Sequence, residues 1–270
     1  MMRRGFFYVV LVTMTLVSVF PFIFSIFMSF RPADQAFAPG ILPDPATAQN
    51  YADVVLTTPL FLRWVLNSVV IAVVSVVLVM ALALMGGFAF ARIPFWGRNA
   101  LLMMMLGSMM IPGQVLWIPN YATLAKIGWV NSWWGLVPGF TGTLTSGIFL
   151  VSQFMKGLPI ELEEAALLDG LGRFGTFRHI ILPLTGPVAA SLVITSFMAS
   201  WNSFAWPVIV LNSPELFTLP IGLNFFKGVY ETRWTLIMAA SMFNTVPVLA
   251  VFVAFQRYFI KGVATSGMKD

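Results

Sequence analysis

The side chains that could do chemistry in this chain are few, and several acids and bases gather in one short stretch. It reads Glu161-Leu-Glu-Glu-Ala-Ala-Leu-Leu-Asp-Gly170, and Arg173, Arg178 and His179 follow. Long runs on either side carry no charge. A polar island in an apolar sequence predicts a segment that lies outside the membrane, in water, where a partner can reach it.

The same residues argue against catalysis by the chain itself. An enzyme needs an activated nucleophile or a set of metal ligands. The chain has no cysteine, a single histidine (His179) and no His-Glu-x-x-His sequence, and Ser146-Gly147 alone is too weak a signal. It also lacks a Gly-x-x-x-x-Gly-Lys-[Ser/Thr] phosphate loop. We expect a non-catalytic protein that holds no metal and hydrolyses no ATP, so any energy must come from a partner.

The composition is that of a membrane protein. Of 270 residues, 59% are hydrophobic and 9% charged, with a mean hydropathy of +0.89, whereas soluble domains are about 45–50% apolar and about 25% charged. Continuous apolar runs long enough to cross a bilayer predict helices rather than alternating strands. We place six spans near 6–30, 64–91, 99–118, 132–155, 186–211 and 234–257, the first an uncleaved anchor rather than a signal peptide.

The basic residues between the spans predict the orientation. With the N-terminus inside, ten of the fifteen Lys and Arg residues fall in inner segments and five in outer ones, which agrees with the positive-inside rule. Both termini and the polar island are then cytoplasmic. The dispersed basic residues give no indication of nucleic-acid binding.

The long inner loop, 156–185, has the pattern of a helix, a turn and a second helix. Pro159 suits a first helical turn, the acids from Glu161 suit its positive end, and Gly170 suits its end. A second short helix is expected from Phe174 to Leu182, ended by Pro183 and Pro187. From these residues alone, the loop is either a docking element or a plain connector.

The spacing Glu164-Ala165-Ala166, Gly170, Ile180-x-Leu182-Pro183 resembles the "EAA" loop of permease subunits of bacterial ABC importers. Asn67-Ser68, Phe90-Ala-Arg92 and Trp201-Asn-x-Phe-x-Trp-Pro207 are similar to the carbohydrate permeases of the maltose-transporter type, on the side of the smaller subunit. The resemblance covers roughly residues 60–262.

The resemblance implies an all-α, six-helix type I ABC importer permease bundle with a cytoplasmic helix-turn-helix coupling loop, in the bacterial inner membrane. We divide the chain into 1–62 (first helix and outer loop), 63–257 (permease domain) and 258–270 (cytoplasmic tail). The implied partners are a second permease subunit in a heterodimer, two ATP-binding subunits that carry ATP and Mg, and an extracytoplasmic solute-binding protein. The implied ATPase docking set is Glu164, Ala165, Ala166, Gly170 and Pro183.

Polar groups within spans are expensive in lipid and are candidates for the transport path. We single out Gln114, Trp201, Asn202, Trp206 and Asn244, which are equally well explained as contacts between helices. The outer connection 212–233 contains the candidate binding-protein contacts Glu215, Lys227, Glu231 and Arg233.

The expected cargo is a sugar or an oligosaccharide. The absence of a basic residue within the spans favours a neutral sugar over another solute such as glycerol phosphate. A secondary transporter is the remote alternative, because it needs intramembrane charges for ion coupling, and here the charges map to loops and span ends.

Overall fold

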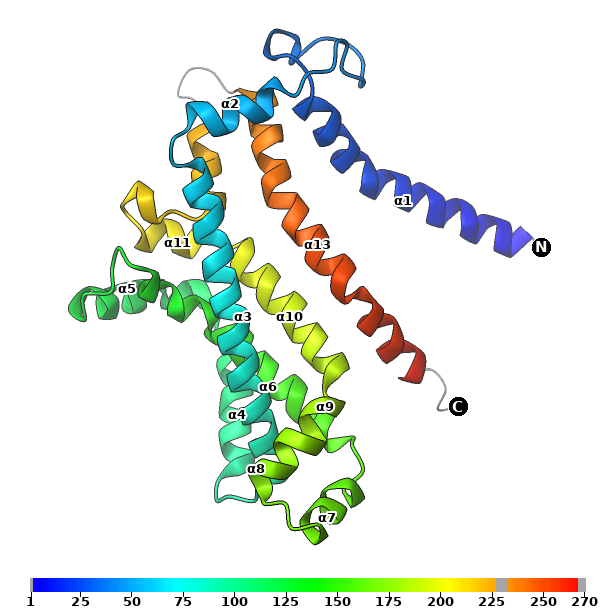
Figure 1. Cartoon of the computed structure of the whole chain (residues 1–270), viewed down its shortest axis with the longest axis vertical. Coiled ribbons are helices and arrows are strands. Elements are labelled where there is room, and N and C mark those ends of the chain that lie inside the picture. Colours follow the sequence, from blue (N-terminus) through cyan, green and yellow to red (C-terminus); the bar gives the residue numbers. More distant parts are fainter. Residues whose placement is uncertain (1, 227–232, 267–270) are drawn as a thin grey trace. The chain divides into compact units, whose positions relative to one another are not determined.

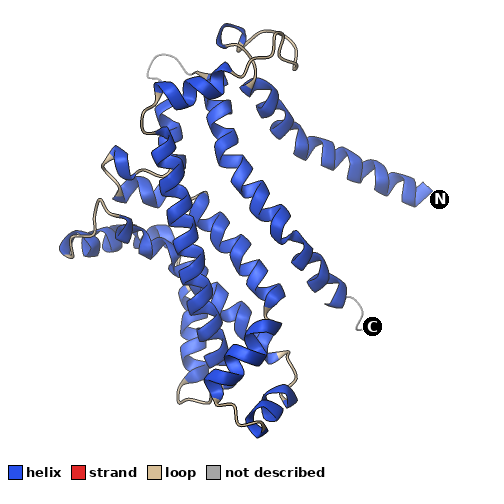
Figure 2. Ribbon diagram, viewed as in Figure 1, coloured by secondary structure: helices blue, strands red, loops and turns tan. Residues whose placement is uncertain are grey.

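The computed structural model describes residues 2–226 and 233–266, and all regular structure in those ranges is helical (Figure 2). Four segments are each long and apolar enough to cross a membrane: Gly5–Ser29, Phe61–Arg92, Trp133–Lys156 and Trp234–Arg257. Two pairs of helices qualify only if each pair is one bent span, which raises the number to as many as six. The predicted all-helical membrane fold is confirmed, and the predicted number of spans holds if both bent pairs are counted.

The predicted third span, 99–118, is wrong as a continuous helix. α4 (Arg98–Ser108) ends, and the chain resumes as η2 (Gly113–Leu116) and α5 (Trp117–Lys126) after a bend of 92°. Pro112 explains the break. Proline has no N–H to donate, and it disfavours the helical conformation of the residue before it, Ile111.

The predicted fifth span, 186–211, is also interrupted. α10 (Gly186–Trp201) carries Pro187 near its start, and α11 (Ala205–Val210) begins after a short break. A proline clashes with the carbonyl four residues earlier in a helix, so Pro207 disfavours a helical Ser203. Asn202 therefore lies at the break and not in the middle of a span as predicted.

Two compact units form by packing. One comprises the chain up to Val65 together with Leu219–Pro247, and the other comprises Leu66–Thr218 together with the chain from Val248 onwards. The division made from the sequence follows chain order, whereas these units join segments that are distant in the sequence.

The first unit contains α1 (Met2–Ser29), η1 (Ala33–Gln35), α2 (Gln49–Thr57), the start of α3 (Phe61–Arg92), α12 (Leu219–Gly222), η6 (Leu223–Phe226) and the start of α13 (Trp234–Ser266). Its core is aromatic: Phe61 packs edge-on against Phe226 and Phe243, with ring centroids 6.0 and 5.0 Å apart. Gly222 lies against Trp64, where an added Cβ would come within 2.1 Å of the ring. Residues 219–226 thus belong to a packed core, although the sequence placed them in an outer connection.

The segment that follows α1 is held in shape by side chains that donate hydrogen bonds to its backbone carbonyls. Arg31 is 4% exposed, and its guanidinium donates to the carbonyls of Ala38, Gly40 and Leu42. The Asn50 side chain donates to the carbonyls of Ser29 and Arg31 at 2.8 Å. These bonds give the segment between α1 and α2 a defined shape.

The second unit contains most of α3, then α4, η2, α5, η3 (Trp133–Phe140), α6 (Thr141–Lys156), the inner loop, α10, α11 and η5 (Pro214–Leu216). One apolar cluster joins α3, α6 and α10 and includes Phe88, Met155 and Leu192. Gly87 permits the close approach of α3 to α6, since an added Cβ would lie 2.3 Å from Cγ1 of Val151. Phe177 of the inner loop belongs to the same cluster, so the loop is packed onto the ends of these helices.

Candidate functional site

The inner loop, residues 156–185, begins with a short helix, α7 (Glu161–Leu168), and Figure 1 shows α7, α8 and α9 gathered at one end of the second unit. Three glutamates lie in its first turn, where carboxylates interact favourably with the helix dipole. Pro159 precedes the helix by two residues, so its predicted place in the first turn was wrong.

Gly170 ends α7 as predicted. It has a φ of +81°, and its N–H donates to the carbonyl of Leu167 at 3.1 Å while the N–H of Leu171 donates to that of Ala166 at 3.0 Å. This pair of bonds is the Schellman motif. A left-handed conformation costs a residue with a Cβ about 1–2 kcal/mol, which is why glycine suits this position.

The two faces of α7 differ. Glu163 and Ala166 are turned inward, 8% and 3% exposed, whereas Glu164 and Ala165 are exposed. Leu168, one turn beyond Ala165, is 89% exposed, and Phe174 on the next helix is 70% exposed. Sequence reasoning missed these two side chains, although the spacing of Ala165 and Leu168 places them on one helical face.

The second helix of the loop is longer than predicted. α8 (Arg173–Thr176), η4 (Phe177–Ile181) and α9 (Leu182–Leu184) run on without a break. Pro183 does not end it but lies within it, exposed. The middle segment is a π-helix in which the N–H of Leu182 donates to the carbonyl of Phe177. This wider turn changes the backbone pattern just before the proline, and the helix turns by 77° only after Leu184, into α10.

A buried ion pair joins the loop to α3. Nε of Arg92, the last residue of α3, contacts Oε1 of Glu163, and both side chains are 11% exposed. Nη2 of Arg92 donates to the carbonyl of Leu158 at 2.8 Å. This pair could not be predicted from local sequence patterns, because 70 positions separate the two residues.

A pocket of about 610 Å³ opens in the second unit, at the bend between α4 and α5. Trp117 and Trp206 lie in its wall with ring centroids 6.5 Å apart. Asn120, Thr141, Thr145 and Ser203 contribute polar groups, and no lining residue is charged. Two aromatic faces among amide and hydroxyl groups can stack on a sugar and hydrogen-bond to it.

The predicted path residues differ in whether they reach this pocket. Trp206 lines this pocket, and its indole N–H donates to the carbonyl of Gly135 at 3.0 Å. Gln114 and Asn202 are exposed but do not line it. Trp201 is 1% exposed and stacked on Phe197, so its ring is closed to a ligand in this structure. Asn244 is partly buried within the first unit.

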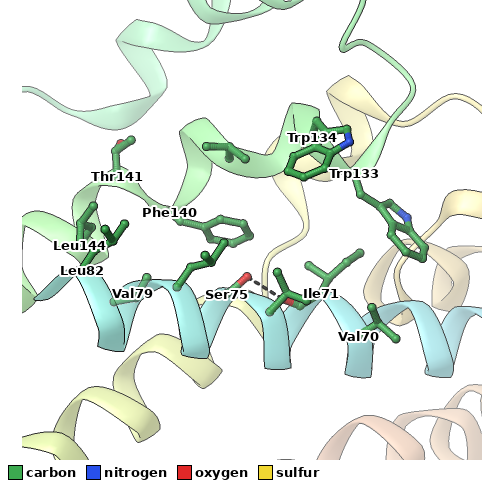
Figure 3. Close-up of a pocket in the computed structure, with 13 residues that line it drawn as sticks. Val70, Ile71, Ser75, Val79, Leu82, Trp133, Trp134, Phe140, Thr141 and Leu144 are labelled. Carbon is green, nitrogen blue, oxygen red and sulfur yellow. Dashed lines mark hydrogen bonds between the residues drawn. The ribbon is translucent and has the colours of Figure 1, made fainter. Parts of the chain in front are cut away.

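A second pocket, of about 440 Å³, lies between α3 and the segment Trp133–Leu144 (Figure 3). Its walls are aliphatic and aromatic, and the labelled side chains come from these two segments. The hydroxyl of Ser75 donates to the carbonyl of Ile71 at 2.6 Å. With so few free polar groups, this pocket does not suit a sugar.

Side chains of two segments hold the start of the predicted binding-protein loop. Oδ1 of Asn131 accepts from the N–H groups of Asn212 and Ser213, both at 2.9 Å. Nδ2 of Asn67 donates to the carbonyls of Glu215 and Phe217 at 2.9 Å. The Glu215 side chain is left exposed on η5. Arg233 is also exposed, in the first unit, whereas Lys227 and Glu231 lie outside the described residues.

Several apolar spans and a helical loop with exposed charged and apolar side chains define a multi-pass membrane protein. The chain belongs to the family described as binding-protein-dependent transport system inner membrane component, which matches residues 82–265.

Two relatives and one solved structure illustrate the similarity. The arabinooligosaccharides transport system permease protein AraQ of Halalkalibacterium halodurans is 36% identical over 94% of this chain and 92% of its own length. The trehalose/maltose transport system permease protein MalG of Thermococcus litoralis is 30% identical over 96% and 94%. A bacterial ABC transporter that imports the acidic polysaccharide alginate has a chain with a TM-score of 0.81, at 20% identity over 94% of this chain and 96% of its own. The last likeness supports the predicted importer-permease fold.

Proposed function

We propose that this chain is a permease subunit of an ATP-driven ABC importer for a neutral sugar or oligosaccharide, and that the inner loop is where ATPase subunits drive it. The observation that carries the proposal is the outer face of α7. Glu164 and Ala165 are exposed there, and Leu168 projects beside them. Exposed apolar groups among charges are typical of an interaction surface.

The docking role follows from shape and charge. The small side chain of Ala165 lets the helix lie deep in a groove, Glu164 can meet a basic residue there, and Leu168 with Phe174 supplies apolar anchors. Gly170 ends the helix so that the second one can follow, and Pro183 lies exposed on that second helix. Ala166 supports the surface from below, because it is 3% exposed.

The assembly we propose has two permease subunits, two ATP-binding subunits that hold ATP and Mg, and an external binding protein. The chain lacks a phosphate loop of its own, which supports an external source of energy. Both termini and the inner loop are then cytoplasmic. Glu215 and Arg233, with Lys227 and Glu231, would meet the binding protein on the other side.

The sugar assignment is supported by the names of the relatives and by the pocket at the bend between α4 and α5. The transport path we propose passes Trp206 in that pocket, with Gln114 and Asn202 exposed elsewhere in the same unit. Trp201 supports this region from the core, whereas Asn244 lies in the first unit and stays a separate candidate. An uncharged lining favours a neutral sugar over a phosphorylated solute.

The test is reconstitution of the whole transporter in vesicles, with ATP hydrolysis and uptake measured on a panel of arabinotriose, maltotriose and glycerol 3-phosphate. We expect the ATP-binding subunits to co-purify with the chain, and a neutral oligosaccharide with the binding protein to stimulate both activities. Stimulation by glycerol 3-phosphate alone would overturn the sugar assignment, and a chain that purifies without ATP-binding subunits would overturn the importer assignment.

A further inference from the structure

Arg92 and Glu163 have no part in the docking surface, yet they form a buried ion pair between two elements far apart in the sequence. Arg92 is the last residue of α3, and Glu163 lies in the first turn of α7. Each side chain is 11% exposed. Charges this far from water are costly unless paired, so removal of one partner leaves the other uncompensated.

The arginine joins two parts of the loop at once. Its Nε contacts Glu163 of α7, and its Nη2 donates at 2.8 Å to the carbonyl of Leu158, just before α7. The planar guanidinium can hold two acceptors in fixed directions, which a lysine ammonium cannot do in the same way. The entry to α7 and α7 itself are thereby fixed to the end of α3.

Little else on α7 can replace this link. Ala166, one turn further on the same inward face, is buried but offers only a methyl group, and a methyl group contributes about 0.8 kcal/mol of burial. By contrast, the residues beside the pair are well anchored: Ala91, Ile93 and Leu158 pack against the apolar cluster of α3, α6 and α10.

We propose that the Arg92–Glu163 pair is a positioning link that makes α7 and the inner end of α3 move as one body. A displacement of the docking loop then moves the span Phe61–Arg92 as well, instead of only bending the loop. This inference rests on the proposed importer function, since it concerns the same docking loop.

The first experiment measures the distance between α3 and α7 directly. The chain has no cysteine, so spin labels can be placed at Met85→Cys on α3 and Leu162→Cys on α7, which are 49% and 40% exposed. Pulsed electron paramagnetic resonance on the whole transporter should give one narrow distance distribution, with the same mean without nucleotide and with ATP and vanadate. In Glu163→Gln the distribution should broaden.

The matched control is Glu161→Gln, which neutralises an exposed glutamate of the same helical turn and should leave the distribution narrow. The double exchange Arg92→Glu with Glu163→Arg should narrow it again. A mean distance that changes between the two nucleotide conditions in the unmodified pair would overturn the proposal. So would a narrow distribution in Glu163→Gln.

The second readout separates positioning from mere stability. In the reconstituted transporter, Glu163→Gln should keep its basal ATP hydrolysis and its bound ATP-binding subunits. Its stimulation by binding protein saturated with arabinotriose should fall about tenfold, within the usual range for coupling between sites. An equal loss of assembly and of basal hydrolysis would show a stability role only and would overturn the proposal. If arabinotriose fails to stimulate the unmodified transporter, this sugar is not the cargo. The distances between the spin labels still test the Arg92–Glu163 link.

Discussion

The sharpest single test of the proposed docking role of the inner loop is Gly170→Val. Gly170 has a φ of +81°, and an added Cβ would find no heavy atom within 4 Å. The cost of the substitution is therefore conformational rather than steric. A left-handed conformation costs an L-residue about 1–2 kcal/mol, and β-branched valine is among the residues least suited to it. Because about 1.4 kcal/mol is a factor of ten in an equilibrium, the native end of α7 should become about tenfold less favoured while the spans remain folded.

The chain supplies a matched control at Gly128. It ends α5 with a φ of +73° and open space around its Cβ position, and its N–H and that of Trp129 donate to the carbonyls of Ala125 and Leu124. This is the same Schellman motif as at Gly170, so Gly128→Val carries the same conformational cost at a different place.

The assay is uptake and ATP hydrolysis in vesicles, with membrane insertion measured in parallel. We expect both valine variants to insert, Gly170→Val alone to lose uptake by up to about tenfold, and Gly170→Asn to retain most of it because asparagine tolerates the left-handed region. Full uptake by Gly170→Val would refute the reasoning. Equal losses in the two valine variants would show that any strained helix end has this effect.

Three further predictions concern other parts of the chain. Gly87→Ala places a Cβ 2.3 Å from Cγ1 of Val151, so it should destabilise the fold by about 1–3 kcal/mol and lower the melting temperature in detergent, whereas Gly86→Ala should do so less because it meets only the side chain of Ile148. Asn131→Ala removes the acceptor of two backbone N–H groups and a 2.7 Å bond to Ser213; it should cost about 1–3 kcal/mol, expose the start of the outer loop to protease and weaken stimulation by the binding protein. Trp117→Ala should raise the KM for sugar uptake about tenfold, equivalent to ~1.4 kcal/mol of stacking, with basal ATP hydrolysis unchanged; an unchanged KM would exclude the pocket from the path.

The sequence predicted the first helix of the inner loop and its end at Gly170, because those signals are local. Acids at a helix start, two alanines and a glycine at a helix end act within a turn or two of the backbone. The predictions from the sequence were wrong at two prolines. Pro112 breaks a predicted span, whereas Pro183 lies inside a helix that it was expected to end. A proline excludes one particular hydrogen bond, but the surrounding chain decides whether the helix bends, widens or stops.

By itself the sequence determined that this is an all-helical membrane protein and where its polar loop lies, because backbone groups in lipid must be satisfied within each span and because the loop motif is a local pattern. Only the tertiary structure decided which face of α7 is free, that Trp201 is buried while Trp206 lines a pocket, and that Arg92 meets Glu163. Those outcomes depend on which distant segments pack together. Hydropathy and spacing cannot show this, since each buried contact requires a partner that the local sequence does not contain.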